Sequence, residues 1–259
     1  MISVVIPTLN AEATLASTLS ALVPAAVEGI VREVVVVDGG STDQTLRIAD
    51  GSGADIVQAS PGRGAQLVAG AARTRFPWLL FLHADSMLES GWEHDAQGFM
   101  ERVDDGRLPP AAAAFGYALD ALGAAPRILE GLVRLRCSVL RLPYGDQGLL
   151  LPRTLYDEIG GHAPMPLMED VDIVRRLGRR RLRMLRSRAI TSASRYRSDG
   201  YLRRIARNQL CLTLHFLGVP GERIRRVYEG RVAPVGKKPG AAPVVRVPAV
   251  PAASNDVSC

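Results

Sequence analysis

Short apolar runs alternate with polar, helix-forming stretches over the first 90 residues of the chain. Four runs are rich in β-branched or aromatic side chains and nearly continuous in apolar character: Ile2 to Ile6, Val34 to Val37, Ile56-Val57 and Trp78 to Leu82. Such runs predict strands that are covered on both faces. Between the first two runs, apolar residues recur at helical spacing at Leu15, Leu19, Leu22, Val23 and Val27. Alternating strands and helices predict an α/β fold with a mostly parallel central sheet flanked by helices.

Polar residues follow each of the four predicted strands. The segments are Pro7 to Glu12, Asp38 to Asp43, Pro61 to Gly64 and His83 to Asp85. Ligands of parallel sheets bind at the carboxyl ends of the strands. The sequence therefore predicts one ligand site along this edge of the sheet.

The pattern changes in the second half of the chain. An alanine-rich strand is predicted at Ala111 to Leu119, an apolar helix at Ile128 to Leu142, and a further helix at residues 201–218. Residues 175–207 are strongly basic, whereas the segment from Pro234 onward has no helical or strand period and predicts a flexible tail.

Composition limits the classes of protein that are possible. The chain has 259 residues, of which 47% are hydrophobic and 22% charged, which excludes global disorder. A net charge of +6 favours anionic partners such as nucleotides, phosphorylated lipids or an acidic membrane surface, and we expect no nucleic-acid partner. We expect neither a signal peptide nor a transmembrane helix, so the expected location is cytoplasmic, with any membrane contact peripheral and at the inner face.

The three cysteines, Cys137, Cys211 and Cys259, are far apart and odd in number. They predict neither a disulfide framework nor a Cys-x-x-Cys metal site, and we interpret them as idle or buried thiols in a reducing compartment.

The segment from Asp38 to Asp43 has the chemistry of a nucleotide contact. Asp38 could accept hydrogen bonds from a base or ribose, and the glycines, among them Gly40, let the backbone approach a flat ligand. Ser41, Thr42 or Asp43 could cap a helix from Gln44 to Ala49 and leave its N-terminus open to an anion. An ordinary capped turn is the alternative.

Three further acidic segments could supply the chemistry of the site. Asp85 follows a buried strand and is suited to hold a divalent cation, with His83 as a second ligand or a hydrogen-bonding residue. Glu169 and Asp170 could act as a general base, although acids at a helix start are also favoured by the helix dipole.

The third of these segments, Tyr144 to Gly148, predicts an exposed turn. In such a turn Asp146 and Gln147 could meet the hydroxyls of a sugar, and a plain β-turn is the alternative. A glycine-rich dinucleotide fingerprint after the first strand and a P-loop are both absent from the sequence.

Four segments together resemble glycosyltransferase family 2 in order and spacing. They are residues 4–12, residues 36–43, His83-Ala84-Asp85 and Glu169-Asp170, and the resemblance covers roughly residues 1–190. The short length, the Gly145 to Gln147 segment and the end from Thr191 to Tyr228 resemble a small bacterial branch often labelled arsenosugar-biosynthesis-associated.

The resemblance implies a GT-A fold and inverting transfer from a nucleotide-diphospho-sugar, commonly a UDP-sugar, with Mg or Mn. It places Asp85 at the metal, Asp170 as the catalytic base with Glu169 beside it, and these residues at the nucleotide: Pro7, Thr8, Glu12, Asp38, Gly40 and Arg63. The departure from the family pattern is His83, where the family most often has Asp. This departure favours an alternative, a catalytically inactive member that binds a nucleotide or scaffolds a complex.

The resemblance also divides the chain. We expect a GT-A domain over residues 1–232, with a nucleotide-binding half at 1–90 and an acceptor half at 91–232, followed by the tail at 233–259. The acceptor, a small molecule or a lipid-linked group, is expected to meet Asp146, Gln147, Arg195 and Tyr196. The arginine-rich stretch is either a solvated face or a surface for diphosphate, a phosphorylated acceptor or an anionic leaflet.

Overall fold

The structure is a computed structural model that describes residues 1–229, apart from the side chains of Arg195 and Glu229. The tail predicted at residues 233–259 and the domain boundary predicted at 232 lie outside the described residues.

One mixed sheet of eight strands forms the centre of the described part of the chain, in the order β3-β2-β1-β4-β7-β6-β8-β5. The strands are β1 (Ile2–Thr8), β2 (Val31–Asp38), β3 (Asp55–Gln58), β4 (Trp78–Phe81), β5 (Ser86–Leu88), β6 (Ala112–Asp120), β7 (Leu149–Pro152) and β8 (Leu182–Ser192). The pairs among β1 to β4 are parallel, as is β6 with β8, while β7 is antiparallel to both of its neighbours and β5 is antiparallel to β8. The α/β fold and the first four strands are therefore confirmed.

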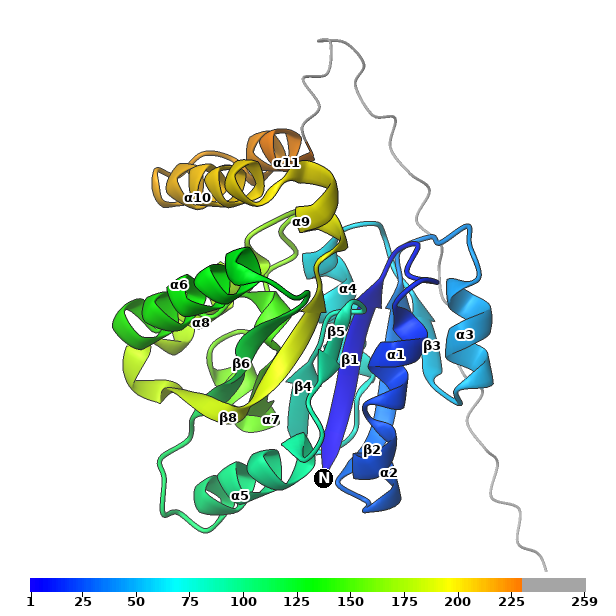
Figure 1. The fold of residues 1–259 in the computed structure, drawn as a ribbon. Helices are drawn as coiled ribbons and strands as arrows, with labels where there is room; N and C mark the ends of the chain where they lie inside the picture. The colour runs from blue at the N-terminus through cyan, green and yellow to red at the C-terminus, as the bar shows by residue number, and fades with distance from the viewer. Residues whose placement is uncertain (230–259) are drawn as a thin grey trace, which may run out of the picture.

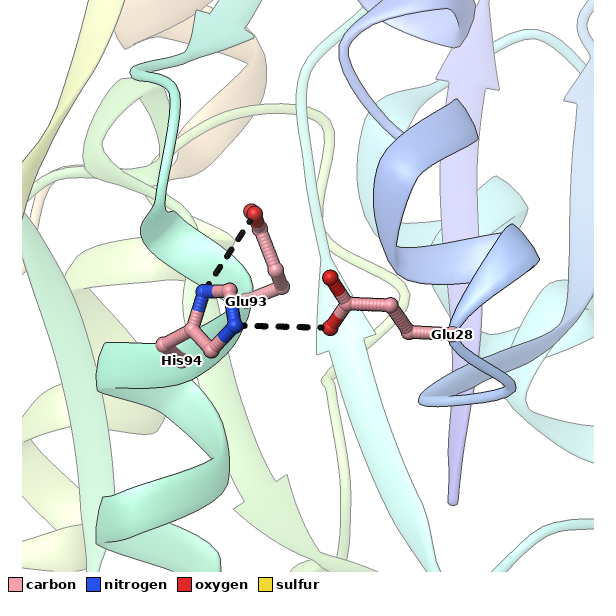
Figure 2. A group of neighbouring side chains, drawn as sticks. All are labelled: Glu28, Glu93 and His94. Carbon is pink, nitrogen blue, oxygen red and sulfur yellow. Dashed lines mark ion pairs between the residues drawn. The ribbon is translucent and has the colours of Figure 1, made fainter.

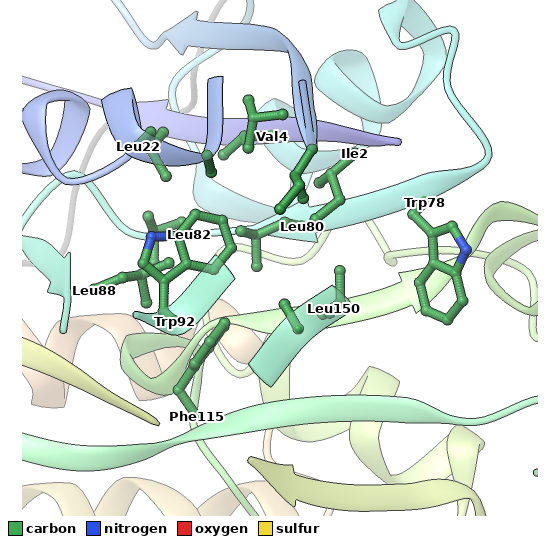
Figure 3. Packing of buried hydrophobic residues seen from close by; sticks show 14 of the residues in the cluster. Ile2, Val4, Leu22, Trp78, Leu80, Leu82, Leu88, Trp92, Phe115 and Leu150 are labelled. Carbon is green, nitrogen blue, oxygen red and sulfur yellow. The ribbon is translucent and has the colours of Figure 1, made fainter. Parts of the chain in front are cut away.

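The first strands are apolar on both faces because helices cover both sides of the sheet. In β1, Val4 points into one core while Val5 points into the other, and Leu79 and Leu80 in β4 divide in the same way. Figure 3 shows the first of these cores, in which Trp92 packs edge-to-face on Phe115 with ring centroids 6.0 Å apart. This two-sided burial explains why β1, β2 and β4 read as continuous apolar runs rather than as alternating ones. The expectation that the Ile56-Val57 strand is also covered on both faces was wrong, because β3 lies at the edge of the sheet and Ile56 is 38% exposed.

Helices surround the sheet in the arrangement seen in Figure 1. Helices α1, α2, α3 and α5 pack against one core, α4, α7 and α8 against the second, and α6 covers β6 in a third, smaller cluster. The α-helices are α1 (Leu15–Ser20), α2 (Val23–Val27), α3 (Thr45–Gly51), α4 (Arg63–Arg73), α5 (Trp92–Asp104), α6 (Ala124–Leu140), α7 (Arg153–Glu158), α8 (Glu169–Leu177), α9 (Ser194–Asp199), α10 (Tyr201–Phe216) and α11 (Gly221–Glu229). Two short 3-10 helices, η1 (Gly145–Gln147) and η2 (Arg179–Arg181), complete the described elements.

The helix predicted between the first two strands is broken into α1 and α2. Pro24 lies in the first turn of α2, where its ring is tolerated, but it cannot continue a preceding helix. The break turns the second segment, so that Val23 and Val27 are 55% and 83% exposed. The expectation that these two valines belong to one apolar face was wrong.

The remaining helix predictions hold with shifted ends. The helix expected from Ile128 begins at Ala124, and the helix expected at 201–218 is α10. Cys137 and Cys211 are buried and free, as expected, while Cys259 lies outside the described residues. No helix within residues 1–229 is both long and apolar enough to cross a bilayer.

Candidate functional site

The loops after β1 and β2 are joined by side-chain to backbone hydrogen bonds. The Asn10 backbone N–H donates to Ser41 Oγ at 2.9 Å, and Asn10 Oδ1 accepts the Thr42 backbone N–H at 2.9 Å. Glu12, one of the residues expected at the nucleotide, accepts the Gln44 N–H at 3.0 Å. The N-terminus of α3 is therefore engaged by this chain's own acids, which corrects the expectation that it is open to an anion.

Asp38 lies beneath this double loop and organises it. Its side chain is 1% exposed, and its Oδ2 accepts the N–H groups of Gly40 and Ser41, each at 2.9 Å. Burial alone would raise the pKa of Asp38, but the hydrogen bonds from Ser41, Gly40 and Thr8 lower it below its usual value. The structure gives Asp38 the role of shaping the loop, since its carboxylate has no oxygen turned to an open surface.

The surface above Asp38 is formed by backbone. Gly40 has a φ of 97° and no atom within 4 Å of where a Cβ would stand, so the chain there is open to a ligand. Thr8 is 2% exposed, and its carbonyl accepts a hydrogen bond from Gln66 at 2.7 Å, while Pro7 beside it is half-buried. Pro7, Thr8 and Gly40 thus lie together at the ends of two adjacent parallel strands.

Arg63 begins α4 and extends toward the acids of α8. Its Nε lies 3.6 Å from Glu169 Oε1, and Glu169 is 1% exposed with no hydrogen bond to either carboxylate oxygen within the described residues. Burial raises the pKa of Glu169 above its usual value, although Arg63 opposes the shift. The pair joins the half-buried Arg63 to a fully buried carboxyl at the end of the sheet.

Gly64 permits the close approach of α4 to the segment before α8. A Cβ at this position would stand 2.4 Å from Ala163 O and 2.6 Å from the Met165 nitrogen. Real Cβ atoms do not come this close to backbone, so the position of Arg63 depends on a glycine after it.

A pocket with about 770 Å³ of empty space, partly open to solvent, gathers side chains from separate segments. It is lined by Arg63, His83, Asp85, Asp146 and Asp170, together with Tyr117, Tyr144, Thr191, Tyr196, Arg204, Asn208, Tyr228 and three apolar residues of α8 and its preceding loop. The structure therefore brings five of the predicted site residues into one pocket, and Tyr196 lines the same pocket.

Asp170 is held in a fixed orientation at this pocket. Its Oδ2 accepts the Gly145 N–H at 2.7 Å, and its Oδ1 accepts the Val171 N–H at 2.8 Å. Gly145 also lies against His83, because a Cβ there would stand 2.5 Å from His83 Nε2. A larger residue at position 145 would displace the His83 ring, so Gly145 allows His83 and Asp170 to lie close to η1.

Asp146 lies in η1 rather than in the exposed turn that the sequence predicted. Its Oδ1 is buried and has no hydrogen-bond partner among the described residues. The pKa of Asp146 is raised to about 6, mainly by burial and also by the nearby Asp170 and Asp85, while Arg136 opposes the shift. An acidic oxygen without a donor, near other carboxylates, is suited to receive a cation or a donor hydroxyl from a ligand.

Gln147 lies behind the pocket. It is 1% exposed, its amide donates to Phe115 O at 2.9 Å, and its carbonyl oxygen accepts from Arg136 at 3.2 Å. The expectation of an exposed amide that meets sugar hydroxyls is therefore not met, and Gln147 instead supports η1.

The described residues of the pocket do not form a preformed cage for a metal ion. His83 Nδ1 lies 3.9 Å from Asp85 Oδ1, and the acids of the pocket are not drawn into a tight cage. Within residues 1–229, three metal-ligating side chains come within 4.8 Å of one another only at Glu28, Glu93 and His94 (Figure 2). That group precedes β2 and starts α5, away from the pocket, where His94 lies between the two carboxylates. A cation at the pocket would thus take part of its coordination from ligand oxygens.

The C-terminal helices α9 to α11 lie over this end of the sheet (Figure 1). They contribute Tyr196, Arg204, Asn208 and Tyr228 to the pocket, and Arg204 donates to the Tyr228 hydroxyl. The side chain of Arg195 lies outside the described part of the chain.

The sequence reasoning did not identify Arg204, Asn208, Tyr228 or Tyr117. A usable signal was the pair Arg204 and Asn208, four residues apart on a helix that is otherwise apolar on that side, because buried polar residues need a partner. Tyr117 carried no signal beyond being one aromatic in an alanine-rich strand.

Comparisons with known proteins agree on the relationship. Residues 3–112 match the model of glycosyl transferase family 2. A curated relative, glucosyl-3-phosphoglycerate synthase of Mycobacterium tuberculosis, is 39% identical over 93 residues, which cover 32% of this chain and 28% of the relative. The aligned region is therefore less than a third of that relative's length.

Solved structures extend the likeness to most of the described chain. Glucosyl-3-phosphoglycerate synthase from M. tuberculosis, in complex with Mn²⁺, UDP and phosphoglyceric acid, superposes with a TM-score of 0.51 at 26% identity and covers 71% of this chain and 67% of that one. Residues 1–349 of S. aureus TarS superpose with a TM-score of 0.60 at 16% identity and cover 88% and 69%, which supports the fold alone. The fold is thus of the GT-A kind.

Proposed function

We propose that this chain, whose residues 3–112 belong to glycosyl transferase family 2, transfers a sugar from a nucleotide-diphospho-sugar to an acceptor hydroxyl. The observation that carries the proposal is the meeting of Arg63, Asp85 and Asp170 at one pocket beyond the carboxyl ends of the strands. Ligands of open α/β sheets bind at this edge. The similar mycobacterial enzyme is known in complex with UDP, which favours a UDP-sugar as donor.

We place the nucleoside over the loops that follow β1 and β2. Pro7, Thr8 and Gly40 offer a surface of backbone and short side chains there, and the open space at Gly40 admits a flat ring. Asp38 acts from below by fixing the Gly40-Ser41 backbone, and Glu12 acts by fixing the start of α3. Strands lie about 4.8 Å apart, so the diphosphate would extend across β1 toward the end of β4 and Arg63.

Asp85 and the unpartnered oxygen of Asp146 would hold a divalent cation, Mg or Mn, with His83 at its side. The solved complex of the mycobacterial relative contains Mn²⁺, which supports this choice. When bound, such a cation offsets the charge of the diphosphate and assists its departure as a Lewis acid.

Asp170 would act as the general base. Two backbone N–H donors fix its carboxylate at the pocket, so that it can take the proton from an acceptor hydroxyl as that oxygen attacks the anomeric carbon. The attack comes from the side opposite the leaving diphosphate, and this inverts the configuration of the sugar. Glu169 is buried behind Asp170 and would hold Arg63 in place for the diphosphate rather than meet the acceptor.

The test is release of UDP from UDP-sugars in the presence of Mn²⁺. We expect UDP to be released from one or a few donors. When no acceptor is present, water takes its place and the donor is hydrolysed. A catalytically inactive nucleotide-binding member would bind UDP and release none from any donor, and that result would contradict the proposal.

A further inference from the structure

Helix α6 is apolar on two sides, and one of them is exposed. Leu129, Val133 and Cys137 pack into the cluster against β6. A second stripe, spaced by four, three and four residues, faces outward: Ile128 is 64% exposed, Leu132 52%, Leu135 59% and Val139 54%. A contiguous exposed stripe of this kind marks an interaction site rather than chance surface leucines.

Three residues of the stripe, Leu132, Leu135 and Val139, line one wall of a groove whose other wall is α10. The groove holds about 1230 Å³ of empty space, partly open to solvent, and its apolar lining includes Leu132, Leu135, Val139, Leu140, Ile205 and Leu212. Its inner end is lined by Tyr117, Tyr144, Asp146, Tyr196 and Asn208, and each of these residues also lines the catalytic pocket. The groove and the pocket are therefore adjacent and share these five residues.

The helices that form the groove are basic. Together α6 and α10 contain six arginines and one acid, Glu130, which pairs with Arg127 at 2.7 Å. Arg136 lies where groove and pocket meet, with its guanidinium 3.5 Å from the centre of the Tyr144 ring. Exposed leucines beside arginines are the pattern of helices that lie against anionic lipid.

We propose that the acceptor is a lipid with an anionic head group, whose hydrocarbon chain lies between α6 and α10 while its head reaches the catalytic pocket. This inference rests on the proposed glycosyltransferase function. The position of the groove beside the pocket selects this occupant, because a molecule with an apolar chain and a polar end would use both spaces. The basic flanks match the charge of its head group and of the leaflet that contains it.

The transfer then proceeds at the inner end of the groove. Asp170 accepts the proton of the attacking head-group oxygen, this oxygen forms a bond to the anomeric carbon, and the bond from that carbon to the diphosphate oxygen breaks. The electron pair of the broken bond leaves with the nucleoside diphosphate. The apolar chain plays no part in the chemistry and holds the head group within reach of Asp170.

The test uses butyl phosphate and octyl phosphate as probes, titrated calorimetrically into the wild-type chain with UDP and Mn²⁺ present. Four additional methylene groups in an apolar groove should tighten binding by at least about tenfold. The double variant Leu132→Glu/Leu135→Glu should reduce that gain to less than about threefold, because carboxylates replace the wall that the chain contacts.

The matched control is Val27→Glu on α2, since Val27 is an apolar helix residue that is 83% exposed and lies outside the groove. This variant should keep the full increase in affinity from butyl phosphate to octyl phosphate. The proposal would be overturned if the wild type bound both probes with equal affinity or bound neither. It would also be overturned if the double variant kept the full increase in affinity from butyl phosphate to octyl phosphate. If thermal unfolding shows that the double variant does not fold, the wild-type comparison decides alone.

Two further readouts separate this proposal from its alternatives. Light scattering that shows a dimer, dissociated by the double variant, would mean that a second copy covers the stripe, and the lipid proposal would fall. UDP release from donors, measured on the same sample, tests the glycosyltransferase function by itself. If that release occurs without any effect of chain length, only the lipid acceptor is wrong.

Discussion

At the scale of single residues, several of the predicted side chains position the backbone of the site and do not face the ligand space themselves. Asp38 does not face the ligand space but fixes the backbone that does, and Gln147 supports η1 from behind. The sequence indicated both positions because acid and amide side chains next to strands can bind a ligand. It assigned them direct contacts because a sequence does not show which carboxylate is already satisfied by neighbouring N–H groups.

Replacing Asp170 by Asn should separate catalysis from binding. The amide oxygen can still accept the Gly145 N–H, although the Val171 N–H loses its acceptor, and the amide cannot take the acceptor proton. We expect turnover to fall by roughly 10²- to 10⁴-fold, the range for loss of a general base, with UDP affinity nearly unchanged. Steady-state kinetics and calorimetry measure the two quantities.

The control for this variant is Asp172→Asn on the same helix, because Asp172 pairs with Arg176 and does not line the pocket. Its turnover should match the wild type. Full activity of Asp170→Asn would remove Asp170 from the role of base.

Asp146 should make the stability of the ligand-free chain depend on pH. Its pKa is about 6 in the folded chain, against 3.8 when unfolded, so the folded state binds the proton more tightly. Ionisation of Asp146 therefore costs stability progressively as the pH rises from about 4 to 6, and this cost is absent below pH 4. Asp146→Asn should raise the unfolding temperature at pH 7 relative to wild type and have little effect at pH 4. Scanning calorimetry in metal-free buffer over this range measures the difference, and an equal shift at both values would contradict the burial of a charged Asp146.

At the scale of elements, the pattern of apolar residues predicted the strands that are covered on both faces and missed others. β8 (Leu182–Ser192) was not predicted, because five of its eleven residues are arginine or serine. Neither a continuous nor an alternating apolar run therefore appears. β5, with three residues, is too short to show a period. β7 is as long as β3 and β4 and contains the apolar run Leu149 to Leu151, so its signal was present in the sequence but was not assigned to a strand. The break between α1 and α2 was readable in principle, because Pro24 interrupts the helical spacing.

The packing of α4 gives a prediction at this scale. Gly64→Ala places a Cβ against the backbone at Ala163 and Met165, and the start of α4 must move away. We expect lower stability by about 1–3 kcal/mol and a weaker affinity for UDP, because Arg63 moves with the helix. Urea unfolding and calorimetry measure these effects.

Gly98→Ala in α5 is the matched control, since no atom lies within 4 Å of its Cβ position. There the substitution should leave UDP affinity unchanged and stabilise the chain by up to about 1 kcal/mol. If the two variants behave alike, the close approach at Gly64 does not position the site.

At the scale of the whole molecule, the sequence predicted that separate polar segments meet at one sheet edge, because parallel strands bring their carboxyl ends together. It placed Tyr196 at the acceptor but did not predict that Arg204 and Tyr228 line the same pocket, since the placement of α10 and α11 depends on long-range packing. Nor did it separate Asp38 from the pocket itself, which contains Asp85, Asp146 and Asp170.

The central claim is that acids from separate segments and Arg63 form one site for a metal-bound nucleoside diphosphate. Titration of UDP into the wild-type chain and into Asp85→Asn, each with Mn²⁺ and with EDTA, tests it most directly. The account predicts UDP binding that requires Mn²⁺ in the wild type and is weakened at least about tenfold in Asp85→Asn, the cost of one lost charged contact. UDP that binds equally well in EDTA, or equally well to both chains, would contradict it.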